Sequence, residues 1–198
     1  MRKTFVLLTA LAMATAALAV EAGKPAPDFT GTDINGKPVK LSDYAGKIVV
    51  IESYNSDCPY CQNHYKTGAM QALQKELADK GVVWLLVNSV NPKNMSHRTP
   101  EQARKEMTDE KMDVTAWIDD SSGVIGHLYG MLTTPHMFVI DKSGTLVYDG
   151  AIDNQPDPTH NPLTADNYVR DAVNDLLIGK TIAVSESKPY GCSVKYAD

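Results

Sequence analysis

The pattern of apolar and polar positions along the chain predicts alternating strands and helices. Residues 47–54 and 82–90 are mainly apolar, and the first run carries β-branched residues on both faces, as expected for strands in the middle of a sheet. Between them, residues 59–79 are expected to form one helix, which Gly81 ends. The apolar stripe of this helix consists of Met70, Leu73 and Leu77.

Turn and capping signals place the other elements. The Asn-Gly pair at 35–36 predicts a hairpin over residues 29–41. The Thr-Pro-Glu-Gln sequence at 99–102 is a capping box with proline at the first helical position, so a helix is expected to about residue 107. Further elements are expected as strands at 114–118, 137–140 and 145–148, a short helix at 123–129, and a helix that Thr164 caps and that runs to Ile178.

This order of elements predicts an α/β fold. Strands that alternate with helices and end in a hairpin favour a mixed, mostly parallel sheet with helices on both faces. In such sheets the chemistry lies at the carboxyl ends of central strands. The strand at 47–54 ends just before Cys58, so the residues around Cys58 are the first candidates for a site.

The N-terminus has the layout of a secretory signal peptide. Two basic residues precede an uncharged apolar run that ends at Leu18, and Ala-Leu-Ala at 17–19 supplies a cleavage site of small residues. The run is short for a membrane span, although an uncleaved anchor is the alternative. We therefore expect residues 1–19 to be removed and the mature protein to be periplasmic.

Length and charge narrow the class of protein. Residues 20–198 are enough for one domain with a full core. We expect that domain over 20–179, followed by a tail over 180–198. The formal net charge of −5, which becomes more negative when the basic N-terminus is removed, argues against non-specific binding of nucleic acid.

The sequence Cys58-Pro59-Tyr60-Cys61 lies where the predicted strand gives way to the predicted helix. The unpaired N–H groups and the dipole of a helix start stabilise an anion, so the pKa of Cys58 is expected to fall to roughly 3.5–7.5. We expect Cys58 to be the nucleophile and the more exposed thiol, and Cys61 to resolve the mixed disulfide. Pro59, which suits the first helical position, and Tyr60 are expected to tune the pair and contact the substrate.

The third cysteine, Cys192, lies in the tail beside Gly191 and among polar residues, which indicates a mobile, accessible segment. It is a candidate for a free thiol, for a second resolving thiol that pairs with Cys58 or Cys61, or for a link to another chain. We favour a role in exchange. A purely structural disulfide is disfavoured, because a bond across the two-residue spacer of the motif closes a very short loop and therefore stabilises the fold little.

Three further segments carry a resemblance to a known family. They are Pro-Ala-Pro-Asp-Phe at 25–29, Thr-Thr-Pro-His-Met-Phe-Val-Ile-Asp at 133–141, and Lys-Pro-Tyr-Gly-Cys-Ser-Val-Lys-Tyr at 188–196. Together with the Cys-x2-Cys motif, they make the chain similar to thioredoxin-fold proteins. More closely, it resembles the redoxin-domain proteins of the alkyl hydroperoxide reductase and thiol-specific antioxidant group, over nearly all of residues 23–196.

The resemblance implies roles for three more residues. Pro135 is expected to be a cis-proline beside the motif, where the backbone around Thr134 and Pro135 receives the incoming substrate chain. Glu52 takes the place of the buried acid of thioredoxins, so it is expected to have a pKa raised by burial and to act as general base for Cys61. In the related branch that has only the first motif cysteine, the tail cysteine is the implied disulfide partner.

The chain departs from this resemblance in two ways. It carries Cys61, which leaves the role of Cys192 open. It also lacks the peroxidase signature, because Asn55 stands where peroxiredoxins have threonine or serine three residues before the reactive cysteine, and no proline lies between positions 47 and 58. The departures favour disulfide exchange over a tuned peroxide pocket.

A metal-binding site is the remaining alternative interpretation of the motif. His64 extends it to Cys-x2-Cys-x2-His on one side of a helix, and His136 is adjacent to Pro135. Thiolates select Cu(I) or Zn(II), so Cys58, Cys61, His64 and His136 are the candidate ligands. Hydrogen-bonded or solvated histidines are favoured instead, and no cofactor is expected.

The sequence therefore predicts an exported thiol–disulfide oxidoreductase that uses Cys58 and Cys61. Its partners are expected to be thiol or disulfide substrates and an electron donor, without nucleic acid and without membrane insertion after cleavage. The alternatives are a thiol peroxidase with Cys58 as the peroxidatic residue and a copper-binding metallochaperone on the same scaffold.

Overall fold

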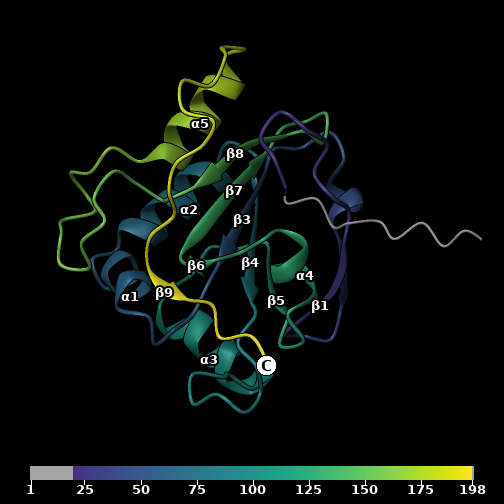
Figure 1. Cartoon of the computed structure of the whole chain (residues 1–198), viewed down its shortest axis with the longest axis vertical. Coiled ribbons are helices and arrows are strands. Elements are labelled where there is room, and N and C mark those ends of the chain that lie inside the picture. Colours follow the sequence, from purple (N-terminus) through teal and green to yellow (C-terminus); the bar gives the residue numbers. More distant parts are fainter. Residues whose placement is uncertain (1–19, 198) are drawn as a thin grey trace, which may run out of the picture.

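A seven-stranded mixed sheet runs through the molecule in the order β2-β1-β5-β4-β3-β7-β8 (Figure 1). The computed structural model describes residues 20–197, so the expected signal peptide lies outside the described residues. The strands of the sheet are β1 (Thr30–Asp33), β2 (Pro38–Lys40), β3 (Val49–Ser53), β4 (Val83–Asn88), β5 (Ala116–Asp119), β7 (His136–Ile140) and β8 (Leu146–Gly150). A separate two-stranded sheet pairs β6 (Thr133–Thr134) with β9 (Cys192–Ser193).

The sheet is mixed, as the sequence predicts, and β3 lies near its middle. Parallel pairing joins β3 to β4 and β4 to β5. The other pairings, of β7 with β3 and with β8 and of β1 with β5 and with β2, are antiparallel. The sheet therefore contains more antiparallel pairing than the mostly parallel sheet expected from the sequence. The reason is that the β1–β2 hairpin forms one edge of the sheet and the β7–β8 hairpin forms the other.

Helices cover both faces of the sheet, and each face has its own core. The helical segments are η1 (Leu41–Tyr44), α1 (Pro59–Lys66), α2 (Ala69–Ala78), α3 (Pro100–Asp109), α4 (Val124–Leu128) and α5 (Tyr168–Leu177). Alternate residues of β3 point to opposite faces, so Val50 packs in the core beneath α1, α2 and α5. Ile51 packs in the other core, with Leu41 of η1 and Ile125 of α4. Within residues 20–197, no helix combines the length and apolar character needed to cross a bilayer.

The prediction of one helix over 59–79 is wrong, because the structure has two. The first, α1, ends at Lys66, and Gly68 adopts φ +77 before α2 begins. Glycine populates this left-handed conformation at little cost. The apolar periodicity continues across the break, which is why the pattern alone indicated a single helix.

Capping explains where the later helices begin. Thr99 and Gln102 make both hydrogen bonds of the predicted capping box at the start of α3. Asn167, rather than Thr164, caps α5 by accepting a hydrogen bond from the backbone N–H of Arg170. The expected start of α5 was therefore too early, since Thr164 bonds Asn161 in the preceding loop.

The tail after α5 is packed on the domain, contrary to the expected mobile segment. It runs back along β8, passes β6 as β9, and continues to Asn91, which hydrogen-bonds the backbone of Lys195 and Tyr196 (Figure 1). Ser187 donates its backbone N–H to Asp149 of β8, and Cys192 pairs in antiparallel register with Thr134. The polar composition hid these contacts, because they are made largely by the backbone.

Candidate active site

The start of α1 places the two motif cysteines one helical turn apart. Cys58 is the N-cap residue, with extended backbone angles, and Pro59 takes the first helical position, where its missing N–H costs no hydrogen bond. The carbonyl of Cys58 accepts the first helical hydrogen bond, from Gln62. Cys58 thus lies at the positive end of the helix, and Cys61 lies beneath it in the core.

The segment that faces Cys58 contains the cis peptide bond expected from the sequence, between Thr134 and Pro135. In its thiol form, Cys58 donates a hydrogen bond from Sγ to the carbonyl oxygen of Thr134, at 2.9 Å. His136 holds this segment from the other side, because its Nδ1 accepts from the backbone N–H of Leu132 at 3.2 Å and its Nε2 lies 2.7 Å from Asp149.

Cys58, Cys61 and Cys192 are free thiols, and Cys192 packs against the core cluster that contains the other two. Hydrogen bonding from Cys61, opposed by burial and assisted by Cys192, lowers the pKa of Cys58 to about 4. Burial and the neighbouring Cys58 raise the pKa of Cys61 well above its usual value. Burial and the hydrogen bond with Cys58 raise that of Cys192 to about 11. Near neutral pH the arrangement therefore consists of one thiolate between two thiols, and Cys58 carries the charge.

The expected exposure of Cys58 is wrong. Both Cys58 and Cys61 have an exposed fraction of 1%. The tail contributes to this burial, because Cys192 and Tyr190 pack against the cluster that contains both cysteines. Pro59 is exposed, whereas Tyr60 is half-buried and its ring lies 5.7 Å from that of Tyr190.

Glu52 is fully buried behind the motif, on the same side of β3 as Cys61. Its carboxylate accepts hydrogen bonds from the hydroxyl of Tyr65, at 3.1 and 3.0 Å, and from Nε1 of Trp84, at 2.9 Å. Burial raises its pKa to about 7, although these hydrogen bonds oppose the shift. Its charge is also among the causes that raise the pKa of Cys61, which places the two groups within electrostatic reach. The residue is thus buried and poised near neutrality, as the resemblance implied.

The loop before Cys58 is held by polar residues that the sequence analysis did not single out. Tyr54 and Ser56 both donate hydroxyl hydrogen bonds to Glu106 of α3. Arg98 donates to the same carboxylate at 3.2 Å and to Asp57 at 2.6 Å. Nothing in the local pattern around the motif indicates these partners, since they lie about 40 to 50 residues further along the chain.

The candidate metal set of Cys58, Cys61, His64 and His136 does not assemble. Nε2 of His64 lies 3.8 Å from Asp153, and both ring nitrogens of His136 are engaged by Leu132 and Asp149. Among the residues that the structure describes, the one group of three ligand-type side chains close enough to share an ion contains His64 but neither cysteine. The favoured interpretation of His136, a hydrogen-bonded histidine, agrees with these contacts.

The fold and the site together define a class, the thioredoxin-like proteins with a dithiol at the start of a helix opposite a cis-proline. Family comparison is more specific: residues 22–149 match the AhpC/TSA family, and the chain belongs to that family. The redoxin resemblance found in the sequence is thereby confirmed.

Several curated relatives are named as thiol–disulfide oxidoreductases. The protein ResA of Geobacillus kaustophilus is 31% identical over 126 residues, which cover 64% of this chain and 67% of the relative. ResA of Bacillus thuringiensis subsp. konkukian is 28% identical over 130 residues, or 66% and 69% of the two chains. These relatives support an oxidoreductase enzyme.

Solved structures confirm the fold. A hypothetical protein from Sinorhizobium meliloti superposes with a TM-score of 0.79 at 22% identity, covering 91% of this chain and 97% of the other. A putative thiol:disulfide interchange protein DsbE from Chlorobium tepidum gives a TM-score of 0.57 at 23% identity, with coverages of 81% and 98%. At these identities the likeness concerns the fold alone.

Proposed function

We propose that this oxidoreductase is an exported thiol–disulfide exchange enzyme whose redox pair is Cys58 and Cys61. The observation that carries the proposal is the pairing of a thiol of low pKa, Cys58, with a buried thiol of high pKa one turn further along α1. Such a pair separates the two chemical roles. Cys58 is ionised and nucleophilic at neutral pH, whereas Cys61 stays protonated until it is needed.

The first step is attack by the Cys58 thiolate on a substrate disulfide. An S–S bond forms between Cys58 and one substrate sulfur, the substrate disulfide breaks, and the other substrate sulfur leaves as a thiolate that takes a proton from solvent. The backbone of Thr134, beside the cis-proline, is the proposed docking edge for the substrate chain.

The second step releases the substrate. Glu52, with a pKa of about 7, takes the proton of Cys61, and the new thiolate attacks Sγ of Cys58. The mixed disulfide breaks, the second substrate sulfur leaves as a thiolate that takes a proton from solvent, and Glu52 returns its proton to solvent. The enzyme then holds a Cys58–Cys61 disulfide, and two electrons have passed to the substrate. An external dithiol must reduce it for another turnover, and the reverse sequence oxidises a substrate dithiol.

The tail has two parts in this proposal. Because β9 occupies the backbone edge of Thr134, it must leave before a substrate strand pairs there. Cys192 also serves as a second resolving thiol, since it pairs with Thr134, whose carbonyl oxygen lies 2.9 Å from Sγ of Cys58. We treat residues 20–179 as the catalytic domain and 180–198 as this tail.

Disulfide mapping in glutathione buffers of known potential tests the redox pair. We expect a reversible Cys58–Cys61 disulfide that C58S and C61S abolish and C192S retains. In C61S, a Cys58–Cys192 disulfide is expected to replace it. Disulfide exchange with a model peptide no faster than that of free cysteine would contradict the proposal. Consumption of hydrogen peroxide faster than disulfide exchange would favour the peroxidase alternative.

Export is tested separately on the N-terminus. Sequencing of the protein from a periplasmic fraction is expected to give Val20 as the first residue. An intact Met1 on protein confined to the cytosol would contradict export but leave the exchange chemistry untouched.

A further inference from the structure

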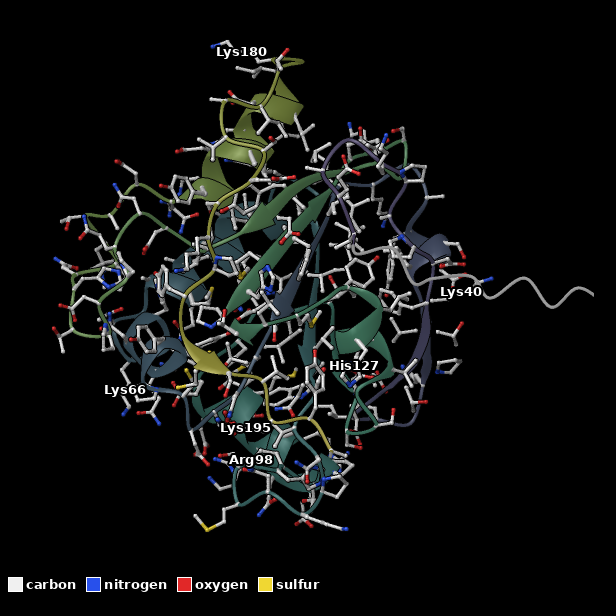
Figure 2. All side chains as sticks on the ribbon, in the orientation of Figure 1. Lys40, Lys66, Arg98, His127, Lys180 and Lys195 are labelled. Atoms are coloured by element: carbon white, nitrogen blue, oxygen red, sulfur yellow. The ribbon has the colours of Figure 1, made fainter. Side chains whose placement is uncertain are left out.

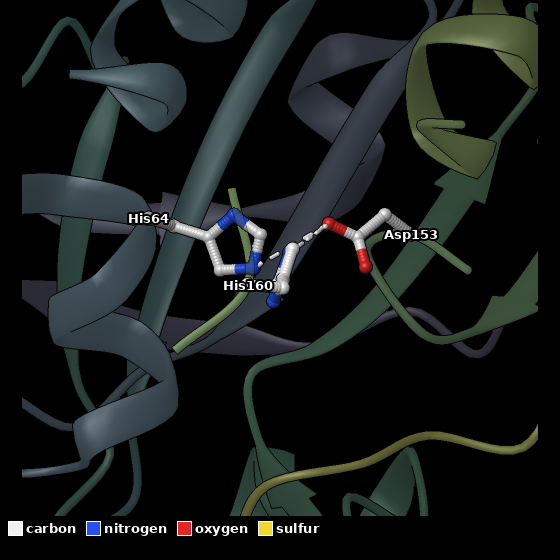
Figure 3. Close-up of side chains that lie close together, drawn as sticks. All are labelled: His64, Asp153 and His160. Atoms are coloured by element: carbon white, nitrogen blue, oxygen red, sulfur yellow. Dashed lines mark hydrogen bonds and ion pairs between the residues drawn. The ribbon is translucent and has the colours of Figure 1, made fainter. Parts of the chain in front are cut away.

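A second polar cluster lies at the last turn of α1 and consists of His64, Asp153 and His160 (Figure 3). His64 comes from the last turn of α1, Asp153 follows β8, and His160 belongs to the loop between β8 and α5. Their side chains are almost completely buried, with exposed fractions of 3%, 0% and 7%. The disulfide exchange proposed above uses none of them.

The spacing of the ligand atoms suits a small cation. Oδ2 of Asp153 lies 3.0 Å from Nε2 of His160 and 3.8 Å from Nε2 of His64, and one ligand atom from each residue lies within 4.8 Å of the others. Ligands about 2.0–2.2 Å from a tetrahedral zinc ion are roughly 3.3–3.6 Å apart. The observed separations bracket that value, so small side-chain movements bring all three residues into one coordination sphere.

The hydrogen bonds around the cluster leave acceptor atoms facing one another. Nδ1 of His160 is hydrogen-bonded to the backbone carbonyl of Asp157, which fixes the proton on that nitrogen and gives Nε2 the lone pair. That nitrogen faces the carboxylate of Asp153, another acceptor. Two acceptors at 3.0 Å need a cation between them, either a proton or a metal ion.

The outer contacts are those of a supported metal site. The other oxygen of Asp153, Oδ1, accepts from the hydroxyl of Tyr190 at 2.5 Å and from the backbone N–H of Gln155 at 2.9 Å. Asn63 anchors the loop to α1 by donating to the carbonyl of His160 at 2.9 Å. Outer partners of this kind orient histidine and carboxylate ligands around metals.

We propose that His64, Asp153 and His160 bind a divalent transition-metal ion, with zinc as the ion that fits best. Two imidazoles and one carboxylate suit Zn(II) and its neighbours rather than Mg(II) or Ca(II), which take mainly oxygen ligands. A fourth position is left for water or for the phenol of Tyr190, whose oxygen lies 3.4 Å from Nε2 of His64. Because Tyr190 belongs to the tail, the bound ion also ties the tail to α1.

The three cysteines must be replaced in the test, because their thiols would bind zinc themselves. We would titrate Co(II), a spectroscopic substitute for zinc, into the full mature chain carrying C58S, C61S and C192S. The expected result is one Co(II) per chain with visible d–d bands and no sulfur charge-transfer band, displaced by one equivalent of Zn(II). Bands that vanish in this variant would assign the metal to the thiols and overturn the proposal.

Two ligand variants and a matched control complete the experiment. H160A and the isosteric D153N, each added to the cysteine-free chain, are expected to weaken Co(II) binding at least about 100-fold, since even outer-sphere changes cost roughly 10–100-fold. H127A is the control, because His127 is exposed on α4 and lies apart from α1 and Lys66 (Figure 2). Equal Co(II) affinity in a folded D153N variant, or no Co(II) bound at all, would reject the site. A proton shared by His160 and Asp153 would then be the cation between them.

Discussion

At the scale of single residues, the acidity of Cys58 depends on its neighbours as well as on the helix start. Cys61 provides the largest contribution, and Cys192 adds a second thiol hydrogen bond from a segment more than a hundred residues away. The motif alone predicted a lowered pKa, but it did not reveal that a third thiol shares the charge.

The pKa of Cys58 is measured by thiolate absorbance at 240 nm. In the reduced protein we expect one thiol to titrate with a midpoint of about 4, well separated from the other two, whose pKa values are raised by burial. C61A should move the low midpoint upward, because alanine cannot donate the main hydrogen bond. The absence of any thiolate step below pH 7 in the wild-type protein would contradict this account.

Glu52 makes stability depend on pH. Its folded pKa of about 7 lies above the ordinary value of 4.5, so the folded state keeps a proton that the unfolded chain loses between those values. The contribution is fully present below pH 4.5 and is lost as the pH rises to 7. At about 1.4 kcal/mol per pH unit, the loss is roughly 3 kcal/mol.

Urea unfolding of wild type and E52Q checks this sign. The difference in unfolding free energy between them should shift in favour of E52Q as the pH rises from 4.5 to 7. A shift in the other direction would mean that Glu52 is charged in the folded state. If Glu52 is also the base for Cys61, E52Q should lose the limb of the pH–rate profile centred near pH 7.

At the scale of elements, two short segments decide the form of the site. The break at Gly68 turns one predicted helix into α1 and α2, and the β6–β9 pair brings the tail to Thr134. Each depends on a backbone conformation at one glycine, which hydrophobic periodicity does not report.

Gly68 has no atom near enough to contact an added Cβ, so its substitution isolates the backbone effect. At φ +77, G68A should reduce the unfolding free energy by about 1–2 kcal/mol. The measurement is urea unfolding, with the redox potential as the control. A stability unchanged within error would mean that α1 and α2 tolerate a continuous helix.

Gly191 holds the tail strand close to the domain. An added Cβ would lie 2.1 Å from the carbonyl oxygen of Thr134, and the residue has φ +138. G191V should therefore displace β9 and raise the rate at which iodoacetamide alkylates Cys58 at pH 7, by an expected tenfold or more if opening costs the wild-type protein about 1.4 kcal/mol. S193A, an exposed position in the same strand, is the control. An equal rate in both variants would show that the tail does not limit access.

At the scale of the whole molecule, local pattern predicts the order of elements and the motif, whereas long-range contacts remain hidden. The apolar runs of β3 and β4 and the cap at Thr99 each carry their own signal. The convergence of His64 with Asp153 and His160 does not, because it depends on how a proline-containing loop crosses α1. The burial of Cys58 is hidden for the same reason, since the tail that contributes to it is far away in sequence.

The pairing of β9 with Thr134 also sets a minimum binding affinity that a substrate chain needs in order to displace the tail. A tethered strand competes at an effective concentration in the millimolar range, whatever the protein concentration. A substrate chain is then bound with an affinity reduced by the fraction of molecules whose tail is released. Under the proposed exchange reaction, such an internal competitor would exclude weakly bound small disulfides and reserve the Cys58 thiolate for partners that dock along the backbone edge.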